Sequence, residues 1–187
     1  MAGHAYFRNG LPVLENTPVR VNSMKELRSG NGRGTVVVVD ADGLSEMRFN
    51  DRLLKSCKVR GNNLLYMGCI KHTEDVLDHF MADIDGLLFP LHMLDSYSVL
   101  DGILRLSEDC IPAVFCTGGK TAASKNASTD IPNTVRMLRN RGFEKIAVLD
   151  TDGSLDENTW NALAYSGTEI LPYIPGRKEG EGLIDLL

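Results

Sequence analysis

Segments with strand character alternate with segments of helical period through most of this chain. The run Gly34 to Val39 (GTVVVV) is β-branched from Thr35 onward and has no charged residue, which is typical of parallel strands buried on both faces. The other expected strands are 63–68, 85–89, 111–116, 146–149 and 169–174, and the expected helices are 73–81, 96–107, 130–140 and 158–165. Near the start, residues 6–14 and 18–21 are expected to form one strand or a hairpin.

This alternation predicts an α/β fold with a mainly parallel sheet. Two architectures fit the pattern: an open doubly wound sheet, and a parallel (β/α) TIM-barrel-like fold that is incomplete or degenerate. In both, ligands bind at the carboxyl ends of the strands, so the loops that follow the strands are where a site is expected.

Length and charge restrict the class of protein further. The 187 residues suffice for one sizeable core, and we expect a single (β/α) domain over 1–187, with the polar loop 117–129 and the tail 176–187 as candidate flexible segments. The net charge of -5 argues against a nucleic-acid partner. No apolar run approaches the ~20 residues of a membrane span, so no membrane association is expected.

The cysteines and the first residues favour a cytoplasmic protein. The N-terminus MAGHAYFRNG has neither the basic nor the apolar region of a signal peptide. None of the four cysteines forms a CxxC pair, and each lies in or next to an apolar segment; they are Cys57, Cys69, Cys110 and Cys116. We therefore expect reduced, mostly buried thiols.

Two strand ends carry paired acids in the same pattern. VVVVDADG ends with Asp40 and Asp42, and IAVLDTDG ends with Asp150 and Asp152, so the chain contains a faint internal repeat. Paired acids at strand ends can divide acid and base roles, which makes Asp40 and Asp150 the candidate catalytic residues. The structural alternative is that Asp-x-Asp-Gly only ends a strand, since it is favourable turn and capping chemistry.

Two loops are candidates for binding an anion through backbone N–H groups. One is the segment Thr117, Gly118, Gly119 and Lys120, which is not a Walker A loop because GxxxxGK[ST] is absent. The other combines Gly68 at a strand end with Lys71 ahead of a helix. The alternatives are a flexible linker for the first loop and a tight strand-to-helix turn for the second.

The histidines do not have the spacing of a metal site. His4, His72, His79 and His92 are scattered, so no metal and no cofactor are expected. His92 follows the expected strand 85–89 directly and could therefore face a pocket.

Several of these segments together resemble the HisA/HisF-type sugar-phosphate isomerase family of histidine biosynthesis. The similar segments are FRNGLPV at 7–13, VVVVDADG at 36–43, LYMGCIK at 65–71 with the following TEDV, DGLLF at 85–89 and DTDGSLDENTW at 150–160. The resemblance implies a (β/α)8 barrel built from two similar halves. It also places Gly176 at the phosphate-binding glycines of the family's seventh strand.

The chain departs from this family at the catalytic positions. The family's first-strand acid falls on or near Tyr6 and its fifth-strand acid at or near Cys116, so the isomerase reaction is not expected. An eighth strand is not expected either, because such barrels typically need about 250 residues. The open sheet edge would then be covered by the N-terminal segment or by a homodimer.

These observations lead to two functional hypotheses. The first is a protein that binds a small phosphorylated or anionic metabolite at the strand ends, with isomerase- or lyase-like chemistry if it is an enzyme. The second starts from a weaker similarity of residues 34–150 to receiver domains and predicts a scaffold that acts through a protein partner. That alternative requires strands 34–39 and 85–89 to be neighbours in an open sheet.

Overall fold

Eight parallel strands form the framework of the protein in a computed structural model. The structure describes residues 2–8, 11–14, 17–18, 35–51, 63–121, 130–173 and 184–186. The parallel strands are β1 (Ala2–Arg8), β4 (Thr35–Asp40), β5 (Asn63–Met67), β6 (Gly86–Pro90), β7 (Cys110–Thr117), β9 (Lys145–Asp150), β10 (Glu169–Tyr173) and β11 (Ile184–Leu186). The helices are α2 (Ala41–Glu46), α4 (Asp75–Met81), the 3-10 turn η1 (Leu91–Met93), α5 (Val99–Leu106), α6 (Ile131–Arg141) and α7 (Glu157–Ala164).

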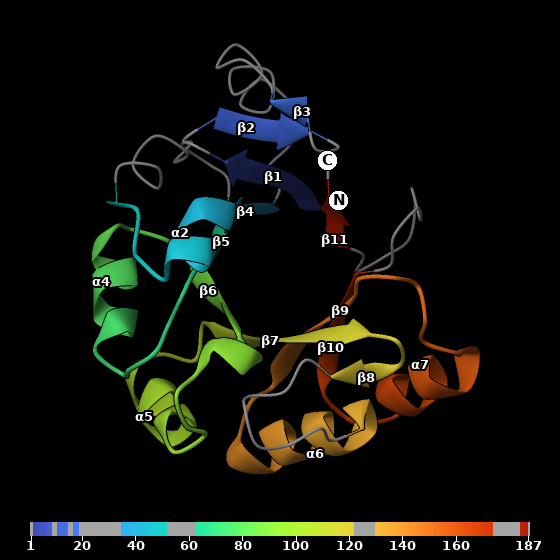
Figure 1. The fold of residues 1–187 in the computed structure, drawn as a ribbon. Helices are drawn as coiled ribbons and strands as arrows, with labels where there is room; N and C mark the ends of the chain where they lie inside the picture. The colour runs from blue at the N-terminus through green and yellow to red at the C-terminus, as the bar shows by residue number, and fades with distance from the viewer. Residues whose placement is uncertain are drawn as a thin grey trace.

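The strands follow one another around a ring in chain order. The ladders join β1, β4, β5, β6, β7, β9 and β10 in that sequence, each parallel to the next. Figure 1 shows α4, α5, α6 and α7 on the outside of this ring. No ladder joins β10 to β11 in the part of the chain that the structure describes, although the two lie close together. The prediction of a parallel, incomplete (β/α) TIM-barrel-like fold is therefore confirmed.

The expectation that an eighth strand is missing was wrong. Residues Ile184–Leu186 form β11, which pairs in parallel with Ala2, Gly3 and His4 of β1. The open sheet edge was expected to be covered by the N-terminal segment or by a second subunit. In the structure, β11 from the C-terminal part of the chain pairs along this edge instead. The receiver-like alternative was also wrong about the sheet, because β5 lies between β4 and β6.

The N-terminal segment forms a hairpin beyond β1. The strand β2 (Leu11–Leu14) runs antiparallel to the end of β1, and β3 (Thr17–Pro18) runs antiparallel to β2. A second small addition lies inside the expected polar loop 117–129, where β8 (Lys120–Thr121) folds back on the end of β7. Residues 122–129 and 174–183 lie outside the described part of the chain, as does residue 187.

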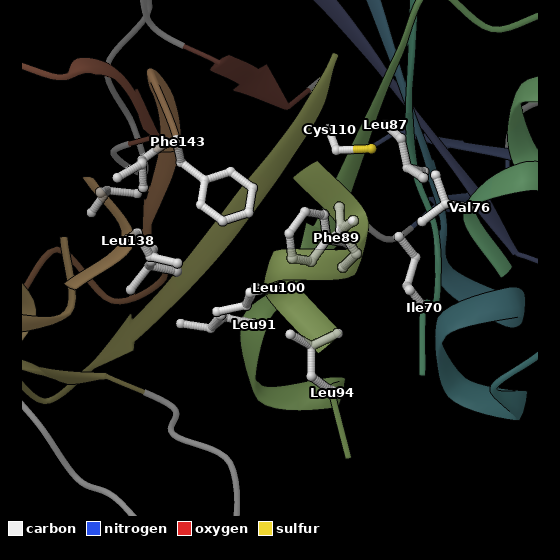
Figure 2. Close-up of a cluster of buried hydrophobic side chains, with 14 of the residues drawn as sticks. Ile70, Val76, Leu87, Phe89, Leu91, Leu94, Leu100, Cys110, Leu138 and Phe143 are labelled. Carbon is white, nitrogen blue, oxygen red and sulfur yellow. The ribbon is translucent and has the colours of Figure 1, made fainter. Parts of the chain in front are cut away.

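The sheet has an apolar core on each of its two faces. The larger core, called here the helix-side cluster, joins strand residues such as Phe89 and Val148 to the helices. Figure 2 shows part of this cluster, with Phe89 near Leu100 of α5; the ring of Phe89 also lies 6.1 Å from that of Phe143. The smaller core, called the inner cluster, is made mainly of alternate strand residues; they are Val39, Met67, Leu88, Ile111, Ala113, Ala147 and Leu149, with Leu44, Leu65, Phe115 and Leu171 packed against them.

Helix ends follow the sequence in one case and not in another. Asp130 caps α6 by accepting a hydrogen bond from the Asn133 N–H at 2.7 Å, and Gly142 ends the helix with a φ of 110°. The expected helix 73–81 begins with Thr73, but no side chain at the N-cap of α4 forms a capping hydrogen bond. Instead the Asp75 carboxylate accepts hydrogen bonds from the N–H groups of Lys71 and His72.

Candidate functional site

The carboxyl ends of the parallel strands meet at one end of the ring, which is called here the mouth. Strand alternation assigns Cys69, Thr117 and Thr151 to the side of the inner cluster, because each lies two residues after Met67, Phe115 or Leu149. Thr117 and Thr151 confirm this neighbourhood, since their hydroxyl oxygens lie 2.8 Å apart. The mouth of the described chain is therefore lined by short polar side chains above an apolar floor.

Asp40 lies on the helix side of the sheet. It follows Val39 of the inner cluster and is fully buried, with one carboxylate oxygen accepting the Gly43 N–H at 2.8 Å and the other accepting the Tyr66 hydroxyl at 2.7 Å. Tyr66 belongs to the helix-side cluster. This geometry favours the capping role for Asp40 over the expected acid–base role at the mouth.

Asp150 has the same orientation on β9. It follows Leu149 of the inner cluster, is 1% exposed, and accepts the N–H groups of Ser154 and Leu155, each at 3.0 Å. The repeat seen in the sequence thus marks two matching strand ends, and in both of them the carboxylate holds the turn that follows. The two backbone hydrogen bonds stabilise the turn. Because the carboxylate is also buried, a substrate at the mouth has little access to it.

The glycine loop at 117–120 already holds polar groups of the chain itself. Gly118 and Gly119 have φ values of 59° and 71°, and their N–H groups donate to Asp152 Oδ2 and Ser154 Oγ, both at 2.7 Å. These two hydrogen bonds connect the loop after β7 to the loop after β9. An external anion would have to displace Asp152 to reach the same N–H groups. Lys120 is exposed and belongs to β8.

Gly68 and Lys71, both in the loop after β5, have different surroundings. A Cβ atom on Gly68 would lie 2.6 Å from His79 Nε2 and would also clash with the Tyr66 ring, so the glycine permits close packing on the helix side. Lys71 is half-buried, and its positive charge works against the rise that burial causes in the pKa of Cys69. The Lys71 N–H is occupied by Asp75, but its ammonium forms no ion pair with the described residues.

His92 is the ionisable side chain that packs on the inner cluster. Its ring lies 5.2 Å from that of Phe115 in an edge-on arrangement, and Phe115 packs against the inner cluster. The Nδ1 atom of His92 is buried and has no hydrogen-bond partner. Burial lowers the pKa of His92, so the imidazole is neutral near pH 7.

The expected site residues are therefore brought together only in part. Lys71, Thr117 and the glycine loop lie at the mouth, whereas Asp40, Asp150 and Gly68 serve the helix side; Gly176 lies outside the described residues. The sequence reasoning did not single out Phe115 or Thr151, because neither belongs to a polar motif. Strand alternation counted backwards from Thr117 would have pointed to Phe115.

Cys116 illustrates why the family's fifth-strand acid has no counterpart here. Its thiol belongs to the helix-side cluster and is fully buried. Burial, assisted by the negative charges of Asp150 and Asp152, raises the pKa of Cys116 to about 12, so the thiol stays protonated. In the described residues the free cysteines are Cys69, Cys110 and Cys116, and all three are buried, as expected.

His79 of α4 is a second buried histidine, on the helix side. It is fully buried, its Nδ1 atom lies 2.6 Å from the Asp75 carbonyl oxygen, and its Nε2 atom has no partner. Burial lowers the pKa of His79, and the Asp75 carbonyl together with the charges of Asp75, Asp78 and Asp40 opposes this only partly. The rings of Tyr66 and Phe49 pack against it, with centroids 5.5 and 4.5 Å away, and against each other at 6.4 Å.

We expect the protein to lose stability as the pH falls from about 7.5 to about 5.5. A histidine whose pKa is lower in the folded state than in the unfolded state, where it is about 6.5, binds fewer protons when folded. Its stabilising contribution is therefore complete above the unfolded pKa and is lost as the pH falls toward the folded pKa. Thermal unfolding of the wild type and of His79→Phe at several pH values measures this effect, and the variant should show the shallower dependence.

His72→Phe is the matched control for this experiment, because the His72 side chain is 62% exposed. His92, whose pKa burial also lowers, accounts for the dependence that remains in the His79 variant. An equal pH dependence in wild type and His79→Phe would contradict the role of His79.

Two negative observations hold for the described ranges. None of the helices there has the length and apolar character needed to cross a bilayer. The same residues contain no group of three or more His, Cys, Asp or Glu side chains arranged to hold a metal ion.

Comparison with known proteins identifies the fold and no family. No protein-family model and no curated protein matches the chain. Among solved structures, the chain is similar to the carboxyl transferase domain of pyruvate carboxylase from Rhizobium etli, with 18% sequence identity and a TM-score of 0.54. The likeness covers 75% of this chain and 28% of that chain. At this identity it shows a barrel-type α/β fold alone, and the relationship to the HisA/HisF family stays a prediction.

Proposed function

We propose that this protein binds a small phosphorylated or otherwise anionic metabolite at the mouth, as a HisA/HisF-related barrel that does not perform the isomerase reaction. The described side chains of the inner cluster include no carboxylate, and Asp40, Asp150 and Cys116 turn to the helix side. An aminoaldose–ketose isomerisation needs a positioned acid and base, and these positions do not supply them.

The observation that carries the proposal is the position of Lys71. It follows β5 at the end of the ring where barrel proteins bind their ligands, and it is half-buried. Its ammonium has no ion-pair partner among the described residues. A cation in this position attracts an anion at a point where the surrounding protein reduces the screening by water.

Replacing Lys71 with methionine is expected to weaken the binding of ribose 5-phosphate and inorganic phosphate about 10- to 100-fold. The reason is that a hydrogen bond to a charged group contributes about 1.5–3 kcal/mol. Isothermal titration calorimetry at low ionic strength measures the two affinities. Methionine keeps the length and apolar stem of lysine, so the loss reports the charge.

Lys145→Met is the matched control, because Lys145 lies at the opposite end of β9 and pairs with Glu169 at 3.9 Å. Its affinity for both anions should equal that of the wild type. The proposal fails if neither anion binds to the wild type, or if the two methionine variants bind them equally well.

The scaffold hypothesis has one observation in its favour, an apolar pair on α4. Leu77 and Met81 are 50% and 83% exposed and lie one helical turn apart. Scattered exposed apolar side chains are common on proteins that bind no partner, so two of them support an interface less than Lys71 supports an anion site. A homodimer is likewise not needed to cover the edge of β1, which β11 already occupies.

A further inference from the structure

We propose that the metabolite carries an apolar, ring-shaped body, which packs on Phe115 and forms a hydrogen bond with His92. This inference rests on the proposed function, because it describes the part of the ligand that lies beyond the anionic group at Lys71. It would make Phe115 and His92 the residues that determine specificity at the mouth.

The first argument comes from the floor of the mouth. The inward-facing apolar residues nearest the ends of four strands are Val39, Met67, Phe115 and Leu149; Thr117 follows Phe115 on the same side of β7, and Phe115 is only partly buried. A sugar bound there would place several hydroxyl groups against side chains that offer no hydrogen bonds, which is unfavourable. A flat apolar ring gains from the same contact, and aromatic rings pack well on a partly exposed phenylalanine.

The second argument comes from His92. Its ring packs edge-on against Phe115, so any group that covers Phe115 lies next to the imidazole. Its Nδ1 atom is buried without a hydrogen-bond partner, as are His79 Nε2 and Thr168 Oγ1, but among these three His92 is the one that packs on the inner cluster. A neutral imidazole can donate or accept one hydrogen bond, which suits a hydroxyl, carbonyl or ring nitrogen of the ligand rather than a second anionic group.

The remaining polar groups at the mouth fit a ligand with a single anionic end. Thr117 and Thr151 already share a hydrogen bond, and Thr151 also donates to the Cys116 carbonyl oxygen at 2.7 Å. The carboxylates of Asp152 and Asp75 already accept the loop N–H groups nearest the mouth. Beside the exposed Lys120 of the glycine loop, the described residues thus offer one half-buried charged contact at Lys71 and one neutral contact at His92.

Calorimetric titration with three probes of similar charge tests the inference: phenyl phosphate, ribose 5-phosphate and inorganic phosphate. The wild type should bind phenyl phosphate at least about tenfold more tightly than the other two, which corresponds to about 1.4 kcal/mol. In Phe115→Leu and His92→Leu this preference should fall to about threefold or less. Leucine removes the aromatic ring in the first variant and the hydrogen-bonding nitrogens in the second, and thermal unfolding confirms that each variant is folded.

Tyr165→Leu is the matched control, since Tyr165 is an aromatic residue that is 89% exposed and distant in sequence from the mouth. It should keep the full preference. Equal or tighter binding of ribose 5-phosphate by the wild type overturns the inference and leaves the anion site intact. A preference that survives in both Phe115→Leu and His92→Leu overturns it as well. Absence of binding by all three probes overturns both the inference and the proposed function.

Discussion

Replacing Asp40 with alanine is expected to lower the free energy of unfolding by about 2–6 kcal/mol. The carboxylate is fully buried and accepts hydrogen bonds from the Gly43 N–H and the Tyr66 hydroxyl, both of which are buried as well. Each buried donor that loses its acceptor costs about 1–3 kcal/mol. Urea denaturation followed by circular dichroism measures the loss, with the slope of the transition as a check on two-state behaviour.

A double-mutant cycle with Tyr66→Phe separates the two bonds. If Asp40 acts mainly through the tyrosine, the losses of Asp40→Ala and Tyr66→Phe will be strongly non-additive. Asp95→Ala, at a side chain that is 63% exposed, is the control and should change stability by less than about 0.5 kcal/mol. The structural role of Asp40 is contradicted if Asp40→Ala is as stable as the wild type.

An alanine at position 68 is expected to destabilise the protein by about 1–3 kcal/mol, although it adds one methyl group. That methyl would lie 2.6 Å from His79 Nε2 and in contact with the Tyr66 ring. Both rings are fully buried and rigid, so neither can move aside without disturbing the helix-side cluster. Thermal unfolding of Gly68→Ala against the wild type gives the cost.

The same substitution distinguishes the two interpretations of this glycine. If Gly68 is needed for packing, the background Tyr66→Ala should relieve the closest contact of the added methyl group, so that Gly68→Ala costs less there than in the wild type. If Gly68 is needed for anion binding, Gly68→Ala should weaken phosphate binding in a protein of normal stability. A normal unfolding temperature for Gly68→Ala would therefore rule out the packing role.

Most of the fold could be predicted because its signals are local. The run at 34–39 became β4 with a shift of one residue, and the capping of α6 by Asp130 was visible in the sequence. The small strands could not be predicted in the same way. The strand β11 (Ile184–Leu186) has only three residues and follows a polar segment. Only its long-range pairing with β1 makes these residues a strand.

The candidate site was harder to predict, because polar motifs identify turns as readily as they identify ligand contacts. Asp40 and Asp150 stand out in the sequence, yet each lies one position past an inward-facing residue and so turns outward. An unbroken run of valines does not reveal which of its faces is the inner one. Phe115 is hidden in an apolar segment for the same reason, and only the spatial neighbourhood of His92 makes it noticeable.

The pairing of β1 with β11 has a consequence for the order in which the protein folds. Each pair of neighbouring strands from β4 to β10 is close in sequence, whereas Ala2 and Ile184 are about 180 residues apart. Bringing such distant segments together carries a larger loop-closure entropy than any other step, and only three residue pairs compensate for it. We therefore expect the pairing of β1 with β11 to form last and to be the first ladder to open when the native state fluctuates, which hydrogen exchange of the β1 amides would measure.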